Sequence, residues 1–340
     1  MDLMEILLLV AVCFLLYAPT GSSGDRSHPA SHQAVSPRED LSSVQPHVGR
    51  AEIANVMRDS LSRFHMSAIN VTSSTRQEMG PVSTLADDQP GAAGNYFAVQ
   101  ETERGSGDYH GFVATLDVYG FSLSPQQLSR AAIWVMNVGD RTPSSLNVIE
   151  LGWEVSPFLY GDSKTHFVTV WTRDGYKETG CYNTKCPGFE AESGATIAPG
   201  GIIDTVSQPP NGLKQNLTLK LVKDGASGDW LVHYGLNNEP ELIGRFPNSI
   251  FTGLADKATN LHFGGLAASS TTNRPAPPMG SGFLPPAAAS FSNIQLIDHN
   301  GEASLLTREL PRVTTNRSLY HITPIVNGGF FYGGPSQPTT

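Results

Sequence analysis

The chain has 340 residues, a formal net charge of −9 and a charged fraction of only 16 %. That length accommodates one large domain or two small ones. The acidic balance argues against nucleic acid as a partner, because phosphate binding requires a basic surface. The 34 glycines and 24 prolines follow no collagen period, and such a composition predicts many turns, as in an all-β protein.

An apolar run opens the chain, over residues 6–17. It is long enough for the central region of a signal peptide and too short for an ordinary membrane span. Small residues follow directly, so we expect residues 1–23 to be a signal peptide and the mature protein to be secreted without a membrane anchor. A signal anchor is the alternative, because Asp2 and Glu5 precede the run and no Lys or Arg does.

Residues 24–94 are predicted to be a poorly structured N-terminal region, because they are polar and rich in turn residues. One short amphipathic helix is expected within it, over residues 51–64. There, apolar residues recur at i, i+3, i+4 and i+8 from Ile53 to Leu61. This helix either packs on the main domain or is the remnant of a pro-segment.

From residue 95 onward the pattern changes to short alternating or β-branched runs separated by Gly, Pro, Asn and Asp. Period-two alternation places one face of a strand in a core and the other in solvent. We therefore predict an all-β fold, an antiparallel β-sandwich over residues 95–335 with a tail over 336–340. Two short segments, 124–131 and 247–258, are helical competitors. The predicted strands cover residues 96–99, 111–119, 131–138, 148–155, 166–172, 217–222, 230–234 and 289–297.

Two of the three cysteines remain once the leader, which contains Cys13, is removed. Cys181 and Cys186 form an even pair, which in an oxidising compartment indicates one short-range disulfide. Two free thiols are the alternative. A zinc site is disfavoured, because no second pair of ligands follows at a suitable spacing.

Three N-glycosylation sequons accompany the signal peptide, at Asn70, Asn216 and Asn316. Each sequon alone is a weak signal. Together with an export signal they predict a secreted glycoprotein.

Common catalytic signatures are missing from the sequence: it contains no G-x-S-x-G, no H-E-x-x-H and no P-loop. The histidines show no pair at metal-ligand spacing on an evident helix, so we expect no metal and no cofactor. Carboxylates are then the remaining candidates for chemistry.

Glu150 is the notable carboxylate, because it interrupts an apolar predicted strand. One interpretation is a solvated face of a half-buried strand. The other is a catalytic acid or base, since two carboxylates in one site push their pKa values apart. Glu154 shares the face but lies about 13 Å along the strand, at about 3.3 Å per residue. A catalytic pair would therefore need a partner from another strand.

Two segments, IELGWEVSPFLYGD and FVTVWTRDGYKETGCYNTKCPGF, resemble the neprosin family, the plant glutamic peptidases. The likeness continues in order to about residue 335, through GDW, LAD, GG, PMGSG and YGGP. The positions that match the family pattern in the first two segments are Glu150, Gly152, Trp153, Val155, Pro157, Tyr160, Gly161, Asp162, Trp171, Thr172, Asp174, Gly180, Cys181, Tyr182, Asn183 and Cys186.

The resemblance implies a secreted plant β-sandwich peptidase, in the apoplast or cell wall, that cleaves after proline in acid. The first catalytic glutamate of the family falls on Glu150. The second closes a Trp-Gly-Gly-Glu segment, and the matching residues here end in Leu266. The family's activation peptide and its additional cysteines are not recognisable either.

Two functions remain open from the sequence. In the first, the chain is a weakly active or inactive relative that binds proline-containing peptides or cell-wall polymers. In the second, it is an active acid peptidase in which His262 or Glu154 replaces the second glutamate.

Overall fold

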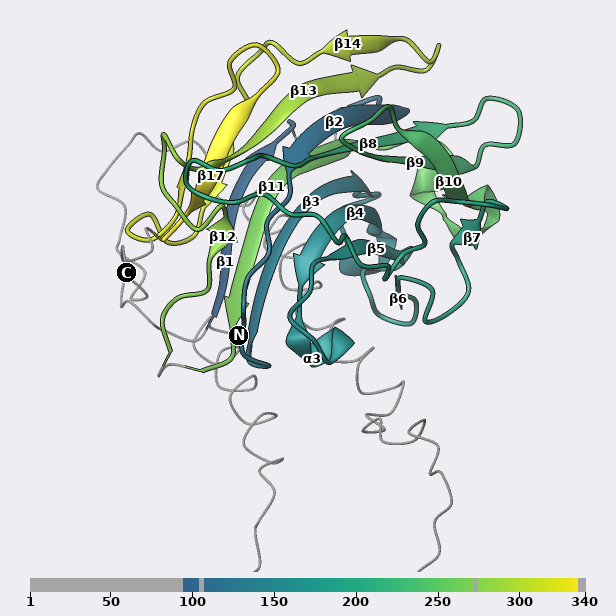
Figure 1. Ribbon diagram of the computed structural model, residues 1–340. Coiled ribbons are helices and arrows are strands. Elements are labelled where there is room, and N and C mark those ends of the chain that lie inside the picture. The colour runs from purple at the N-terminus through teal and green to yellow at the C-terminus, as the bar shows by residue number, and fades with distance from the viewer. Residues whose placement is uncertain (1–93, 104–106, 272–273, 336–340) are drawn as a thin grey trace, which may run out of the picture. The chain divides into compact units, whose positions relative to one another are not determined.

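The computed structural model describes residues 94–103, 107–271 and 274–335. Within these residues the chain forms two antiparallel sheets, which lie one over the other (Figure 1). The predicted all-β sandwich is therefore confirmed. The expected signal peptide and the expected helix over 51–64 lie outside the described residues.

The first sheet contains seven strands, and every neighbouring pair is antiparallel. The central strands β3, β11 and β4 are the longest, and the two edge strands are short. In spatial order the strands are β15 (Arg312–Thr314), β1 (Gly94–Glu101), β11 (Asn260–Ser269), β3 (Gln127–Asn137), β4 (Asn147–Val155), β5 (His166–Thr172) and β6 (Cys181–Tyr182).

The second sheet covers one face of the first, and short helical turns lie in the connections. None of the helices in the described part of the chain is long and apolar enough to cross a membrane. The strands are β12 (Met279–Gly280), β17 (Phe330–Gly334), β13 (Ala289–Ile297), β2 (Gly111–Asp117), β8 (Asn216–Lys223), β9 (Trp230–Leu236), β10 (Glu241–Phe246) and β7 (Glu190–Ala191), with β14 (Ala303–Leu305) beside β13 and β16 (His321–Ile322) beside β17. The helical turns are η1 (Pro143–Ser145), α3 (Pro157–Tyr160), η2 (Asn248–Ile250) and η3 (Gly253–Ala255).

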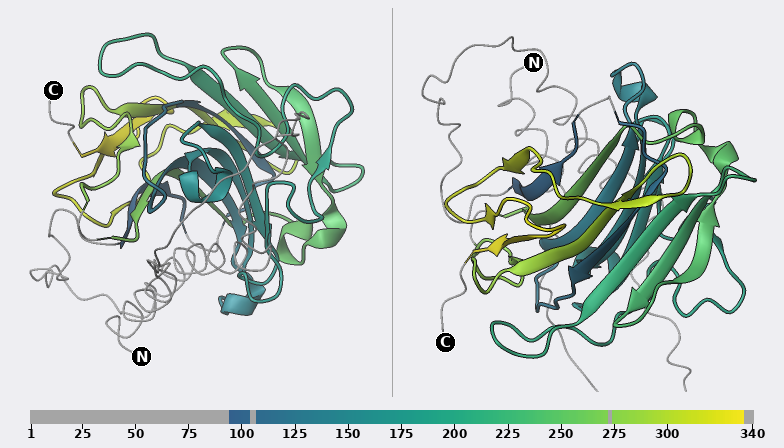
Figure 2. Two further views of the ribbon diagram at one scale, coloured as in Figure 1. Left: turned by 60° about the horizontal axis from the view of Figure 1, so that its bottom comes forward. Right: turned by 90° about the horizontal axis from the view of Figure 1, so that it is seen from above.

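The hydrophobic core lies between the two sheets, whose arrangement Figure 2 shows from two further directions. From the first sheet, Leu151 and Trp153 of β4 point into it, and Leu219 of β8 belongs to the same cluster. The Trp153 indole donates a hydrogen bond of 2.9 Å to the backbone carbonyl of Asp117 in β2. This bond satisfies the only polar atom of a fully buried indole and ties the two sheets together.

Most predicted strands are present, and two agree to the residue: 166–172 is β5 and 289–297 is β13. A helix over 124–131 is wrong, because β3 begins at Gln127. Its backbone pairs with β11 on one side and β4 on the other. Two ladders of hydrogen bonds outweigh the weak helical preference of so short a segment. Segment 247–258 contains only the one-turn helices η2 and η3.

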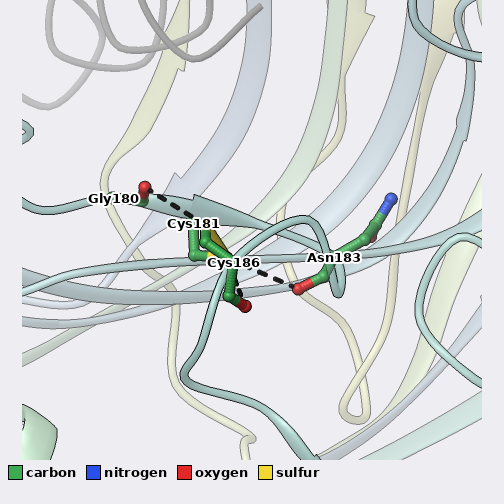
Figure 3. The surroundings of a disulfide bond; sticks show 4 residues. All are labelled: Gly180, Cys181, Asn183 and Cys186. Atoms are coloured by element: carbon green, nitrogen blue, oxygen red, sulfur yellow. Dashed lines mark hydrogen bonds between the residues drawn. A yellow bond between two sulfur atoms is a disulfide. The ribbon is translucent and has the colours of Figure 1, made fainter. Parts of the chain in front are cut away.

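The predicted disulfide between Cys181 and Cys186 is confirmed, with a Cα–Cα distance of 5.7 Å (Figure 3). Cys181 belongs to the edge strand β6 and is buried, whereas Cys186 is exposed. The bond closes a loop that contains Asn183 and returns the chain to the edge of the first sheet.

The sequons differ in accessibility. Asn216 is exposed at the start of β8. Asn316 is only 2 % exposed, and its side-chain oxygen accepts hydrogen bonds from the Ser318 hydroxyl (2.7 Å) and the Leu319 backbone N–H (3.1 Å). Asn70 lies outside the described residues. A bulky glycan fits the first of the two described sites and not the second.

Protein secreted from a eukaryotic host should therefore carry a glycan at Asn216 and none at Asn316. Enzymatic removal of N-glycans in ¹⁸O water, followed by peptide mass spectrometry, should label only Asn216 of these two. Asn316→Gln should leave the mass pattern unchanged and destabilise the fold by about 1 kcal/mol, because a turn loses its side-chain hydrogen bonds. A labelled Asn316 in folded protein would contradict this assignment.

Candidate functional site

The face of the first sheet that points away from the core is also buried. All nine residues of β4 are buried, and Arg130, Glu150 and Glu154 are at most 1 % exposed. The solvated-face interpretation of Glu150 is therefore wrong. Two apolar clusters flank the charged residues on this side of the sheet. The first consists of Phe97, Val99, Ala132, Trp134, Met136, Leu146, Val148 and Leu266, and the second of Val168, Val170, Tyr176 and Tyr182.

Strand register fixes which side chains are neighbours on the outer face, because residues directly opposite each other point to the same side. Glu150 and Glu154 fall in different rows, separated by a row of small residues. One row is Leu266–Arg130–Glu154–His166, the next is Gly264–Ala132–Gly152–Val168, and the third is His262–Trp134–Glu150–Val170.

The small middle row gives Arg130 room to extend along the sheet from its own row towards that of Glu150. At Gly152 a side chain would not fit, since a Cβ atom there would lie 2.0 Å from the backbone oxygen of Ala131. Ala132 contributes only a methyl group. The glycine of the Glu-x-Gly-Trp pattern thus allows the backbones of β4 and β3 to approach closely beside the charged residues.

Arg130 bridges the two glutamates of β4. Its Nη1 donates to Glu150 Oε1 at 2.7 Å. Its Nε and Nη2 both donate to Glu154 Oε2, at 2.9 and 2.5 Å. The partner from another strand that Glu150 requires is therefore a guanidinium from β3, and it serves Glu154 as well. We call these three residues the triad.

Tyrosines surround the triad on the side of α3 and β6. The guanidinium of Arg130 lies 5.8 Å from the Tyr182 ring centroid, and its Nη2 lies 3.5 Å from the Tyr182 hydroxyl. That hydroxyl is 3.3 Å from the Tyr160 hydroxyl, which also accepts a bond of 3.1 Å from Asn183 Nδ2. The Tyr160 ring stacks on His166 at 3.7 Å. The polar network thus joins three separate segments.

Charge on the triad is unbalanced when all three groups are ionised, because two carboxylates face one guanidinium. Burial raises the pKa of Glu150, and neighbouring Glu154 raises it further, while Arg130 only partly offsets both effects. Burial by itself lowers the pKa of Arg130, but Glu150 and Glu154 outweigh it and raise that pKa. The triad becomes neutral when Glu150 holds a proton.

The positions considered for a second catalytic group are apolar, distant from Glu150, or bound to Arg130. Leu266 lies directly opposite Arg130 and belongs to the apolar cluster with Trp134. His262 shares a row with Glu150 but lies two strands away, roughly 10 Å at a spacing of about 4.8 Å, with Trp134 between them. Glu154 is ion-paired with Arg130.

No group of three or more His, Cys, Asp or Glu side chains suited to a metal ion occurs among the residues that the structure describes.

The fold and the motif positions agree with the comparison to known families. The neprosin family model matches residues 125–335, which include the triad, Leu266 and the disulfide. The chain belongs to the neprosin family. Sequence reasoning alone identified this family through Glu150 and its neighbours.

Solved structures resemble the chain more remotely. Scytalido-glutamic peptidase with a transition state analog inhibitor is 10 % identical, covers 72 % of this chain and 99 % of its own, with a TM-score of 0.38. The same peptidase with a peptide-based transition state analog is 11 % identical and has a TM-score of 0.36. The match covers 71 % of this chain and 98 % of the peptidase chain. The β-porphyranase BpGH16B from the human gut bacterium Bacteroides plebeius is 6 % identical, covers 51 % and 65 %, with a TM-score of 0.25.

Arg130 is the site residue of this neprosin-family chain that sequence reasoning missed. It lies in the segment that was interpreted as a possible helix. Every second residue from Arg130, namely Ala132, Trp134 and Met136, lies on the same face of the strand. Both faces of this segment are apolar and buried, so the sequence carries only a weak signal for the place of Arg130.

Glu150→Gln should stabilise the protein at neutral pH and have little effect near pH 4. The pKa of Glu150 is raised in the folded wild type, so the folded state holds the Glu150 proton more tightly than the unfolded state. The stability that this proton contributes is fully present below the ordinary pKa of 4.5 and is lost as pH rises through the raised pKa. Over that range the stability difference between the variant and the wild type should grow by up to about 1.4 kcal/mol per pH unit. Chemical denaturation from pH 4 to 8 measures it, and a difference independent of pH would contradict the assignment.

Arg130→Met should cost about 3–5 kcal/mol, because it leaves two carboxylates buried without their cation. The matched control is the triple variant Arg130→Met, Glu150→Gln, Glu154→Gln, which removes all three charges and should recover much of that loss. Denaturation midpoints of the two variants measure how much of the stability loss comes from the unpaired carboxylates. Equal losses in both would mean that the ionic contacts contribute little.

Proposed function

We propose that this neprosin-family chain is a secreted protein without peptidase activity that binds proline-containing peptide segments. The observation that carries the proposal is the state of the two family positions. Glu150 is bound to Arg130 at 2.7 Å, and Leu266 replaces the second glutamate within an apolar cluster.

Water activation by a pair of glutamates requires one group that gives a proton and one that takes it. Leu266 does neither, and its loss removes a contribution of roughly 10²–10⁴-fold in rate. Arg130 adds a second obstacle, because its guanidinium occupies one carboxylate oxygen of each glutamate, Oε1 of Glu150 and Oε2 of Glu154.

Binding is supported by aromatic side chains at the edge of the outer face. Phe158 of α3 is 39 % exposed, and Tyr160 of the same turn is partly buried beside the triad. Proline-rich segments dock on aromatic surfaces, since their extended conformation is already formed before binding. Cell-wall polymers are a second ligand class, because sugar rings also stack on aromatic side chains.

Secretion is supported by three features: the apolar leader over residues 6–17, the accessible sequon at Asn216, and the disulfide between Cys181 and Cys186. Disulfides form and persist in oxidising compartments. Location in the apoplast or cell wall is part of the proposal.

An active acid peptidase is the second candidate, and one observation favours it. The raised pKa of Glu150 lets this residue hold a proton in mild acid, while Glu154 remains paired with Arg130. This is the division into an acid and a base that catalysis by two carboxylates needs. In that mechanism Glu154 replaces the second glutamate.

Purified wild-type protein should show no cleavage of proline-containing peptides between pH 3 and 6. Leu266→Glu should produce measurable acid-dependent cleavage, because three carboxylates around one guanidinium cannot all stay ionised in a buried site. The carboxylate should also cost about 1–3 kcal/mol in stability. Leu266→Met is the matched control, since it keeps the volume and adds no acid. Peptide mass spectrometry and thermal melts on the same samples provide the readout.

Cleavage by the wild type that disappears in Glu150→Gln would overturn the non-catalytic proposal and favour the second candidate. Binding is tested separately by fluorescence anisotropy with a labelled proline-rich peptide and its alanine-substituted counterpart. Preference for the proline peptide, weakened by Phe158→Ala, supports the proposal. Binding only to pectin or cellulose would assign the polymer as ligand.

A further inference from the structure

The disulfide loop lies directly beside the triad. Tyr182 follows Cys181 in β6, pairs with Val170 of β5 and approaches Arg130 with both its ring and its hydroxyl. It is only 8 % exposed. Its position depends on a strand of two residues at the edge of the sheet, which has few backbone hydrogen bonds of its own.

Asn183 connects the same loop to two other segments. Its backbone N–H donates to the Thr169 carbonyl at 2.7 Å, and the Thr169 N–H donates to its side-chain oxygen at 2.9 Å. Its Nδ2 donates to the Tyr160 hydroxyl at 3.1 Å. The residue is 2 % exposed and adopts a positive φ of 52°. An isolated left-handed residue of this kind needs its surroundings to hold it in place.

One of the two cysteines of the disulfide is exposed. Cys181 is buried in the core cluster, whereas Cys186 is exposed. A thiolate attacks an accessible disulfide sulfur first. The bond is thus open to exchange from outside, while the residues that it holds reach inward to Arg130.

We propose that the Cys181–Cys186 disulfide is a redox-sensitive clamp, and that Tyr182 and Asn183 position Arg130 between the two glutamates only while the bond is intact. A dithiol is the class of reductant. One of its thiolates attacks the Cys186 sulfur and releases Cys181 as a thiolate, which takes up a proton. The second thiol then displaces Cys186, so the disulfide gains two electrons and two protons while the dithiol becomes a disulfide.

Release of the clamp weakens the contact between Arg130 and Glu150, so the ionised form of Glu150 loses its stabilising partner. The buried glutamate should then resist ionisation more strongly. This consequence does not depend on whether the protein cleaves or binds peptides. Several charged and titratable groups surround Glu150. They are Arg130 of β3, Glu154 of β4, His166 of β5, Tyr182 of β6, Tyr160 of α3, His262 of β11, and Tyr176 in the loop after β5.

The test measures the stability gained by Glu150→Gln in two backgrounds, the wild type and the Cys181→Ala, Cys186→Ala pair, from pH 4 to 8. The gain should be roughly tenfold larger, as a folding equilibrium constant, in the alanine background at neutral pH, and equal in the two near pH 4. Wild-type protein treated with dithiothreitol should behave like the alanine pair. Lys185→Ala, in the exposed part of the same loop, is the matched control and should leave the gain unchanged.

A disulfide with a merely structural role would lower stability equally at every pH, and the gain from Glu150→Gln would not change. That result overturns the proposal. Where the alanine pair does not fold, Tyr182→Phe gives the same readout with the disulfide intact, because it removes only the hydroxyl near Arg130. If the stability gained by Glu150→Gln has the same pH dependence with and without Tyr182→Phe, Tyr182 is not a positioning residue and the clamp proposal is wrong.

Discussion

A buried arginine between two buried glutamates is the interaction on which the outer face of the first sheet depends. Moving ions out of water costs several kcal/mol each, and only close geometry with further hydrogen bonds offsets that cost. The surrounding structure meets this demand. Gly152 and Ala132 leave space for the guanidinium, and tyrosines approach it from β6 and α3. Wherever a ligand binds, it must leave this arrangement intact or replace its contacts.

The same interaction underlies the proposed absence of peptidase activity. A glutamic peptidase needs a pair of acids that exchange a proton through water, whereas here a permanent cation stands beside Glu150. Loss of the second glutamate and the presence of the arginine act in the same direction.

The sequence predicted most of the strands, the disulfide and the position of Glu150. These features can be recognised from residues that are close together in the sequence, such as a period-two alternation or two nearby cysteines. Arg130 and β11 were missed for a physical reason. Both faces of these central strands are buried, so alternation between apolar and polar residues is weak there. The ion pairs arise from the register of β3 against β4, which only the paired structure defines.

Burial of the triad has a consequence for the history of the sequence. An apolar residue in place of Glu150 would leave Arg130 Nη1 without its acceptor, whereas glutamine would keep one. Selection for folding alone therefore restricts this position to residues that accept a hydrogen bond, and a glutamate here is not by itself a record of hydrolytic activity. Among relatives, the residue that corresponds to Leu266 is free of that constraint and is the more informative marker of activity.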